Sequence, residues 1–151
     1  MDSKIAKFFN DLEGKKVAFV GIGVTNAPTA KLFAQMGANV YCCDKKDKSY
    51  IGEKICEDLE NVGVEFSLGE NYLDIIPKMD VIFRTPGIMP NAEFIVEAKK
   101  RGQVVTSEME VFFQICPCKI FAVTGSDGKT TTTTLISEML KASGHTVYLG
   151  G

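Results

Sequence analysis

The sequence has no hydrophobic run long enough to cross a membrane. No stretch approaches the roughly 18 consecutive apolar residues of a membrane helix. The N-terminus mixes Asp2 and Lys4 into an amphipathic pattern, where a signal peptide has an unbroken apolar core. Positive charge is not in excess either, because 17 Lys and Arg stand against 19 Asp and Glu, for a net charge of -2. These absences argue against membrane insertion and a nucleic-acid partner, and they predict a cytoplasmic protein with small-molecule partners.

Cysteine occurs in an odd number, and no pair of cysteines has the spacing of a familiar site. The five are Cys42, Cys43, Cys56, Cys116 and Cys118. One residue separates Cys116 from Cys118, whereas zinc sites and thioredoxin motifs place two residues between their cysteines. We therefore expect reduced thiols with no metal or redox role.

What the sequence does contain is a phosphate-binding pattern near its C-terminal end. An apolar run, 120–123, is followed by TGSDGKTT at 124–131 and then by a helical pattern. Glycines in such a loop let successive N–H groups and a helix N-terminus point at a phosphate. Lys129 is placed to reach the terminal phosphates of a nucleotide, and the hydroxyl of Thr130 is placed to bind the Mg²⁺ that accompanies them.

This loop departs from the standard Walker pattern, which has a glycine where the chain has Val123. The shorter form Gly-x-x-Gly-Lys-Thr remains, and such a string can arise by chance in a glycine-rich turn. The context argues against chance, since an apolar run precedes the loop and a one-face helical pattern follows it. The residues of that pattern are Leu135, Ile136, Met139 and Leu140. We therefore predict a strand, a phosphate loop and a helix.

A second nucleotide-binding pattern lies near the N-terminus. A buried-strand run leads into GIGVTN at residues 21–26 and a helix, and Asp44 stands at the end of the next strand. Asp44 follows Gly23 by 21 residues, which is the position of the acidic residue in dinucleotide-binding units. Asn26 replaces the third glycine of the full pattern, and asparagine tolerates left-handed backbone better than most residues. The pattern supports a nucleotide-diphosphate site without specifying the nucleotide.

Strand and helix patterns alternate over the first hundred or so residues. Strands are expected at 17–20, 39–43, 64–66, 79–83 and 104–105, with helices at 3–12, 29–36, 55–62 and 91–101 between them. A further helix should begin at Ser107, its N-cap, with Met109, Phe112 and Phe113 as its apolar face. This order predicts an α/β fold with a parallel sheet and helices on both faces. The loops 21–25, 44–46 and 85–88 should then converge at one edge of the sheet.

The phosphate loop begins a second unit with few elements. Only two strands, 120–123 and 146–149, and one helix belong to it. A phosphate-loop sheet needs more strands than that to cover its faces, so we expect the chain to be truncated.

Four stretches occur together in the order and spacing of one family. They are the loop 21–25, the turn TPGI at 85–88, the segment SEMEVFF at 107–113 and the loop VTGSDGKTT at 123–131. Together they resemble the Mur ligases over essentially the whole chain. The resemblance implies a Rossmann-like domain at 1–107 that binds a UDP substrate, followed at 108–151 by the start of a central P-loop ATP-binding domain. The member most similar adds D-glutamate to UDP-N-acetylmuramoyl-L-alanine in peptidoglycan synthesis, using ATP and Mg²⁺ to form an acyl-phosphate.

The resemblance also implies which residues act. The UDP moiety would be held by Gly23, Val24, Thr25, Asp44, Lys45 and Gly87. ATP would be held by Gly125, Ser126, Asp127, Gly128, Lys129, Thr130 and Thr131. Lys129 and Thr130 would be catalytic, and Thr130 would also bind Mg²⁺. The D-glutamate site would lie in a further domain, so the fragment alone is expected to bind the UDP moiety and to be inactive.

Other interpretations remain open. Asp44 also suits a cap of the turn after its strand, and Glu108 and Glu110 also suit the N-terminus of a helix. An NAD(P)-dependent oxidoreductase would use the first glycine loop and Asp44, but it leaves Lys129 without a role. A non-catalytic nucleotide-binding module is the third alternative.

Overall fold

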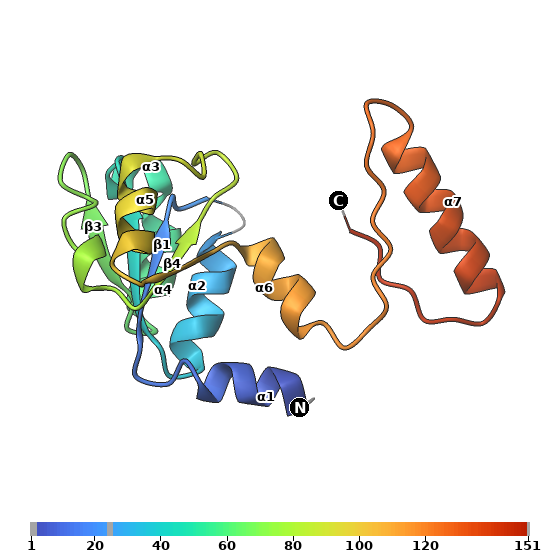
Figure 1. The fold of residues 1–151 in the computed structure, drawn as a ribbon, viewed down its shortest axis with the longest axis horizontal. Coiled ribbons are helices and arrows are strands. Elements are labelled where there is room, and N and C mark those ends of the chain that lie inside the picture. Colours follow the sequence, from blue (N-terminus) through green and yellow to red (C-terminus); the bar gives the residue numbers. More distant parts are fainter. Residues whose placement is uncertain (1–2, 24–25, 151) are drawn as a thin grey trace. The chain divides into compact units, whose positions relative to one another are not determined.

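The computed structural model describes residues 3–23 and 26–150 (Figure 1). The chain divides into two compact units, Met1–Pro117 and Cys118–Gly151. Within the described residues, no helix is both long and apolar enough to cross a membrane.

The first unit is built from five parallel strands and the helices between them. The strands are β1 (Lys16–Val20), β2 (Asn39–Asp44), β3 (Glu65–Leu68), β4 (Val81–Arg84) and β5 (Val104–Thr106). The helices are α1 (Ser3–Asn10), α2 (Asn26–Gln35), α3 (Lys48–Ile51), α4 (Glu53–Glu60), the 3₁₀-helix η1 (Ile76–Lys78), α5 (Glu93–Lys100) and α6 (Glu108–Ile115). The strand order is β3-β2-β1-β4-β5, which confirms the predicted α/β fold with an all-parallel sheet.

Both faces of this sheet are buried, which explains why its central strands are apolar throughout. Along β1, Val17 and Phe19 face one core cluster, and Ala18 and Val20 face the other. All four side chains have no exposed surface. Parallel strands covered by helices on both faces are typically such continuous apolar runs.

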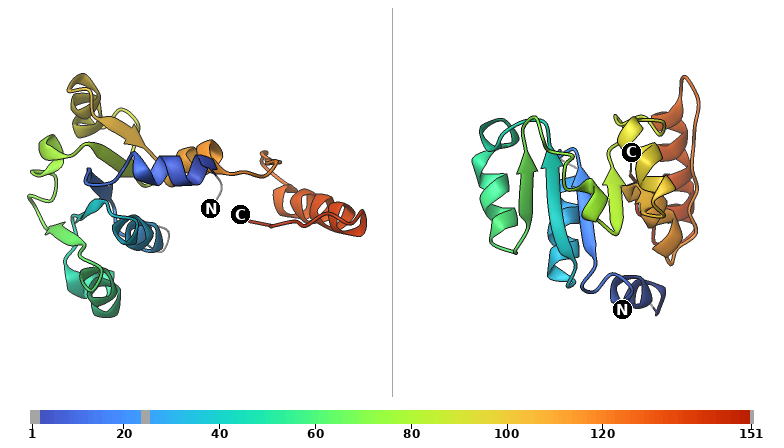
Figure 2. Two further views of the ribbon diagram at one scale, coloured as in Figure 1. Left: turned by 90° about the horizontal axis from the view of Figure 1, so that it is seen from below. Right: turned by 60° about the vertical axis from the view of Figure 1, so that its left-hand side comes forward.

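Helices lie on both faces of the sheet (Figure 2), and different helices contribute to the two core clusters. Helices α1, α2, α4 and α6 contribute to the cluster that contains Phe19, whereas α5 and η1 contribute to the other. The phenyl ring of Phe33 on α2 meets the ring of Phe19 edge-on at 5.5 Å and that of Phe83 at 5.0 Å. This aromatic packing fixes α2 on the sheet and thereby positions the loop that leads into it.

The strand order reverses beside β1, since β2 pairs with one of its edges and β4 with the other. In an open parallel sheet, ligands bind at the carboxyl ends of the strands on either side of such a reversal. The loops after β1, β2 and β4 are therefore the elements that matter for the site.

Several sequence predictions for this unit were wrong in detail. Helix α6 buries Val111, while the three side chains predicted to form its apolar face, Met109, Phe112 and Phe113, are 47–55% exposed. The helix spacing of Val111 and Ile115 allows both to reach the core, and the aromatic residues lie off that face. Helix α3 was not predicted, because a four-residue helix is too short to show periodicity.

The second unit contains one helix, α7 (Lys129–Ala142). The strands predicted at 120–123 and 146–149 are absent, although both segments lie within the described residues. A strand needs a neighbour to accept and donate its backbone hydrogen bonds, and these segments form no ladder. Helix α7 contains the four apolar residues whose spacing predicted a helix, and two of them, Leu135 and Met139, are more than half exposed.

Candidate functional site

The loop after β1 begins with a glycine that no other residue can replace without strain. Gly21 has φ +87°, and its N–H donates to the carbonyl of Cys43 on β2 at 2.8 Å. A Cβ atom at this position would lie 2.8 Å from Cγ2 of Thr85, which follows β4. Glycine thus permits both the left-handed backbone and the close approach of three strand ends.

Asn26 stabilises the same turn from the other side. Its side-chain amide donates to the carbonyl of Gly21 at 2.8 Å, and only 3% of the residue is exposed. Asn26 does not use the left-handed backbone that asparagine tolerates, since it is the first residue of α2 and no described residue other than glycine has positive φ. A side-chain hydrogen bond therefore takes the place of the missing third glycine.

Asp44 joins the loops after β1 and β2. One carboxylate oxygen, Oδ2, accepts the N–H of Ile22 at 2.7 Å, and the other, Oδ1, accepts the N–H of Lys46 at 2.9 Å. The second contact is the turn cap that the sequence allowed. The first contact also bridges to the glycine loop, so the carboxylate shapes both walls of the site.

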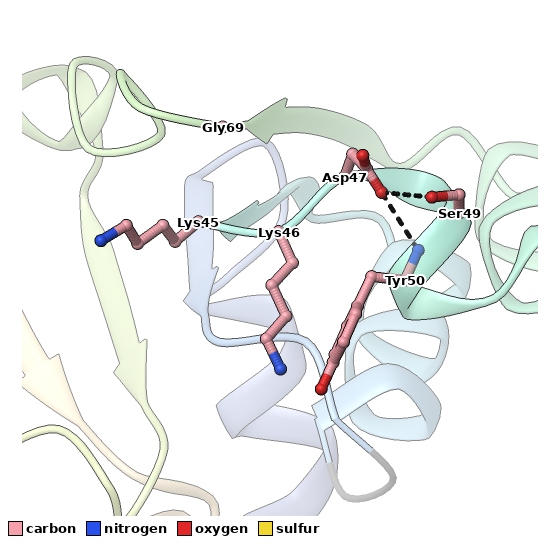
Figure 3. A pocket seen from close by; sticks show the side chains of 6 residues that line it. All are labelled: Lys45, Lys46, Asp47, Ser49, Tyr50 and Gly69. Carbon is pink, nitrogen blue, oxygen red and sulfur yellow. Dashed lines mark hydrogen bonds between the residues drawn. The ribbon is translucent and has the colours of Figure 1, made fainter.

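The turn after Asp44 leads into the short helix α3. The carboxylate of Asp47 accepts the hydroxyl of Ser49 at 2.6 Å and the N–H of Tyr50 at 3.1 Å (Figure 3). These two hydrogen bonds, the one from Ser49 first, hold the pKa of Asp47 below its usual value. The cap orders the segment that carries Tyr50.

Two hollows adjoin these loops. A cleft of about 160 Å³ is lined by Ile22, Gly23, Asp44, Lys46, Tyr50, Ile51 and Ile55. A shallower hollow of about 390 Å³ is lined by Lys45, Lys46, Asp47, Ser49, Tyr50 and Gly69. Lys46 and Tyr50 line both, and the ammonium of Lys46 lies 3.5 Å from the centroid of the Tyr50 ring.

The third converging loop is the turn after β4. The N–H of Thr85 donates to the carbonyl of Val20 at 3.3 Å, so this turn lies against the end of β1. The guanidinium of Arg84 donates to the carbonyl of Ile88 at 3.4 Å and lies 4.0 Å from the carboxylate of Glu110. These contacts hold both ends of the turn.

The structure brings together some of the residues expected to hold UDP. Gly23 and Asp44 line one cleft, and Lys45 lines the adjoining hollow with its side chain directed away from the Lys46–Tyr50 pair (Figure 3). Gly87 is exposed on the turn after β4 and lines neither hollow. The remaining two, Val24 and Thr25, lie outside the described residues.

Sequence reasoning missed the wall of the cleft formed by α3 and the start of α4. Tyr50, Ile51 and Ile55 belong to this wall. The available signal was Asp47 followed by Ser49, a local capping pattern directly after the strand-end carboxylate. This capping pattern indicates that the next residue, Tyr50, is held in place by the cap.

The phosphate loop of the second unit ends at the N-terminus of α7. Gly128, the N-cap, has φ +74°. The ammonium of Lys129 donates to the carbonyls of Gly125 at 2.6 Å and Ser126 at 2.9 Å, so it lies over its own loop. An anion can replace those carbonyls as the partner of this ammonium, since a phosphate carries full negative charge.

The residues of this loop suit a nucleotide phosphate and its metal. The first N–H groups of α7 have no intrahelical acceptor and point toward the loop. Thr130 is exposed at the first turn. Within residues 3–23 and 26–150, no cluster of three or more His, Cys, Asp or Glu could hold a metal by itself. A Mg²⁺ ion here would therefore depend on the Thr130 hydroxyl and phosphate oxygens.

The buried cysteines are not nucleophiles. Burial raises the pKa of Cys42 and that of Cys43 to about 12, and burial also raises the pKa of Cys56. At neutral pH these groups are thiols, and they act as small apolar side chains in the core.

The strand order, the glycine turn after the central strand and the carboxylate after its neighbour define an α/β domain of the Rossmann type. Residues 15–107 match the family model of the Mur ligase MurD-like N-terminal domain. The chain therefore belongs to the MurD-like Mur ligase family.

Individual relatives agree with this assignment. The chain is 49% identical over 151 residues to the UDP-N-acetylmuramoylalanine--D-glutamate ligase of Clostridium botulinum (strain Hall), covering 100% of this chain and 33% of that protein. It thus spans about a third of the length of the curated relatives it matches. The crystal structure of a murein peptide ligase from Psychrobacter arcticus has a TM-score of 0.55 at 25% identity, covering 87% of this chain and 27% of that one.

A dehydrogenase shares the fold. The shikimate dehydrogenase of Aquifex aeolicus has a TM-score of 0.52 at 12% identity, covering 78% of this chain and 54% of that chain. At that level of identity the likeness concerns the fold alone.

Proposed function

We propose that the chain carries the UDP-binding domain and the start of the ATP-binding domain of an ATP-dependent ligase. The whole enzyme would add D-glutamate to UDP-N-acetylmuramoyl-L-alanine in the cytoplasm. The domains would be residues 1–107 and 108–151. The observation that supports the proposal is that one chain contains two separate glycine loops at helix N-termini, one held by Asp44 and one closed by Lys129.

The first arrangement would receive the UDP moiety. Gly23 lines the cleft beside Asp44, and the loop that contains Gly23, Val24 and Thr25 leads into the N-terminus of α2, where a diphosphate is favoured. Lys45 would supply positive charge from the adjoining hollow, and Gly87 would border the ligand from the turn after β4.

The second arrangement would receive ATP and Mg²⁺. Gly125, Ser126, Asp127, Gly128, Lys129, Thr130 and Thr131 would surround the phosphates. Lys129 would neutralise charge on the transferred phosphoryl group, and Thr130 would bind the metal. Phosphorylation of the substrate carboxylate would give an acyl-phosphate, which the amine of D-glutamate attacks to form the amide and release phosphate.

The oxidoreductase alternative receives less support from the geometry. In dinucleotide-binding domains, the acidic residue after the second strand accepts hydrogen bonds from ribose hydroxyls. The two backbone N–H groups that Asp44 accepts leave a lone pair on each oxygen, so Asp44 by itself suits either kind of nucleotide. The loop around Lys129, however, has no role in hydride transfer.

Binding and turnover assays on the chain test the proposal together. We expect it to bind UDP-N-acetylmuramoyl-L-alanine and Mg-ATP, and to produce no ADP when D-glutamate is added. ADP formation that requires both the UDP-sugar and D-glutamate would contradict the proposal that the fragment is inactive. Absence of UDP-sugar binding would contradict the proposed site itself.

A further inference from the structure

The most unusual side chain of the cleft is Tyr50. Tyr50 is 69% exposed, although aromatic residues usually bury most of their surface. Tyr50 lines both hollows, and the ammonium of Lys46 lies over one face of its ring, 3.5 Å from the centroid. A large apolar face is therefore held beside a cleft with a cation over it.

The position of this ring is set by the local structure. Tyr50 lies in α3, whose N-terminus is capped by Asp47 and whose C-cap, Gly52, has φ +109°. The N–H of Gly52 closes the turn by donating to the carbonyl of Lys48 at 2.9 Å. Caps at both ends fix a four-residue helix that is too short to persist by itself, so the ring is presented in a defined direction.

The other walls of the cleft complement a flat ligand with a polar edge. Ile22, Ile51 and Ile55 supply apolar contacts, and Asp44 supplies polar atoms at one side. The cleft has a volume of about 160 Å³, which leaves room for a single six-membered ring with its substituents.

We propose that Tyr50 is the stacking surface for the pyrimidine base of the UDP substrate, and that Lys46 covers the ring until the base displaces it. The inference rests on the proposed function, because the base is that of UDP. Base-to-aromatic stacking is generally stronger than an exposed contact between an ammonium and a ring, so the exchange is favourable. Tyr50 is thus a specificity residue that reads the planar base, whereas the glycine loop receives the diphosphate.

Calorimetric titration of the chain with UDP tests this assignment in three variants. Tyr50→Leu removes the aromatic face and should weaken UDP binding at least fivefold. Tyr50→Phe keeps the face and should bind within twofold of the unchanged chain. The matched control is Tyr148→Leu, the same chemical change at an 87% exposed residue of the second unit, and it should leave UDP affinity unchanged.

Proton NMR of bound UDP distinguishes stacking of the base on Tyr50 from a merely structural role of this residue. A stacked base lies in the ring current of Tyr50, so the uracil ring protons should shift upfield in the unchanged chain and in Tyr50→Phe. The shift should disappear in Tyr50→Leu even at saturating UDP. A persistent shift, or UDP affinity within twofold for Tyr50→Leu, would overturn the assignment of Tyr50 while leaving the UDP site intact. Absence of UDP binding by the unchanged chain would overturn both proposals.

Discussion

The carboxylate of Asp44 accepts the backbone N–H of Ile22 at 2.7 Å, and this hydrogen bond connects the end of β2 to the glycine loop after β1. Because the same carboxylate also holds the N–H of Lys46, one side chain defines the opening of the cleft. The geometry makes Asp44 a residue that positions both loops, beyond any contact it makes with a ligand.

Asp44→Ala should weaken UDP binding and lower stability together. Two hydrogen bonds from backbone donors are lost, which should reduce the free energy of unfolding by about 1–3 kcal/mol. Without the connection, Ile22 and Lys46 are no longer held at the cleft, so UDP affinity should also fall. Urea denaturation and calorimetric titration with UDP measure the two effects.

Asp80→Ala is the matched control for that experiment. The carboxylate of Asp80 accepts the N–H of Lys16 at 2.8 Å, at the opposite end of the sheet. Its removal should cost about 1 kcal/mol of stability and leave UDP affinity unchanged. Equal losses of affinity in the two variants would show that Asp44 acts only through general stability.

Gly21→Ala should be more destabilising than the same change at another left-handed glycine. Gly63 has φ +84° and no atom within 4 Å of an added Cβ, so Gly63→Ala measures the backbone cost alone, about 1–2 kcal/mol. At Gly21 the contact with Thr85 adds about 1–3 kcal/mol of crowding. Adding Thr85→Ala to Gly21→Ala should recover most of that difference in urea denaturation. No recovery would contradict a steric cause.

Stability should fall at alkaline pH because of the buried thiols. The pKa of Cys42 and that of Cys43 are raised to about 12 in the folded chain, whereas an unfolded thiol titrates near pH 9. Between pH 9 and 12 the folded state therefore holds more protons, and the free energy of unfolding decreases as pH rises, by up to about 1.4 kcal/mol per pH unit for each thiol. The double variant Cys42→Ala, Cys43→Ala should show a shallower slope in denaturation series across this range. An unchanged slope would count against burial as the cause.

Lys129→Ala should abolish Mg-ATP binding without affecting UDP binding. The ammonium is the cation that closes the phosphate loop of the second unit, whereas the proposed UDP site belongs to the first unit. Lys141→Ala, which removes a surface ion pair with Glu138 on the same helix, serves as the control and should bind Mg-ATP normally. Calorimetry with each nucleotide separates the outcomes, and retained ATP affinity in Lys129→Ala would contradict the proposed ATP site.

The parallel sheet could be predicted from the sequence because its strands are buried on both faces. Val17 to Val20 is apolar without interruption, and glycines mark the turns that follow. Ser107 was also correctly predicted as the N-cap of α6, where its hydroxyl accepts the N–H of Glu110 at 3.3 Å. These features depend on local sequence, which a pattern can show.

Features that depend on tertiary partners could not be predicted in this way. The run 120–123 has strand composition, but no described segment pairs with it in a ladder. Phe112 and Phe113 are apolar, yet the direction of α6 places Val111 against the core. An apolar side chain is suited to burial, but whether it is buried depends on the elements that pack against it.

The candidate site was predictable only in part for the same reason. Gly21, Gly23 and Asp44 follow a spacing that recurs in nucleotide-binding units, and the structure places them at adjoining strand ends. The contact between Asn26 and Gly21 and the wall formed by Tyr50 are particular to this chain. Such contacts become visible only when the loops are seen in space.

The most direct test of the central claim is calorimetric titration of the chain with UDP-N-acetylmuramoyl-L-alanine, with NADH titrated in parallel. The account predicts saturable binding of the UDP-sugar and no binding of NADH. Binding of NADH without the UDP-sugar would contradict it and favour the oxidoreductase.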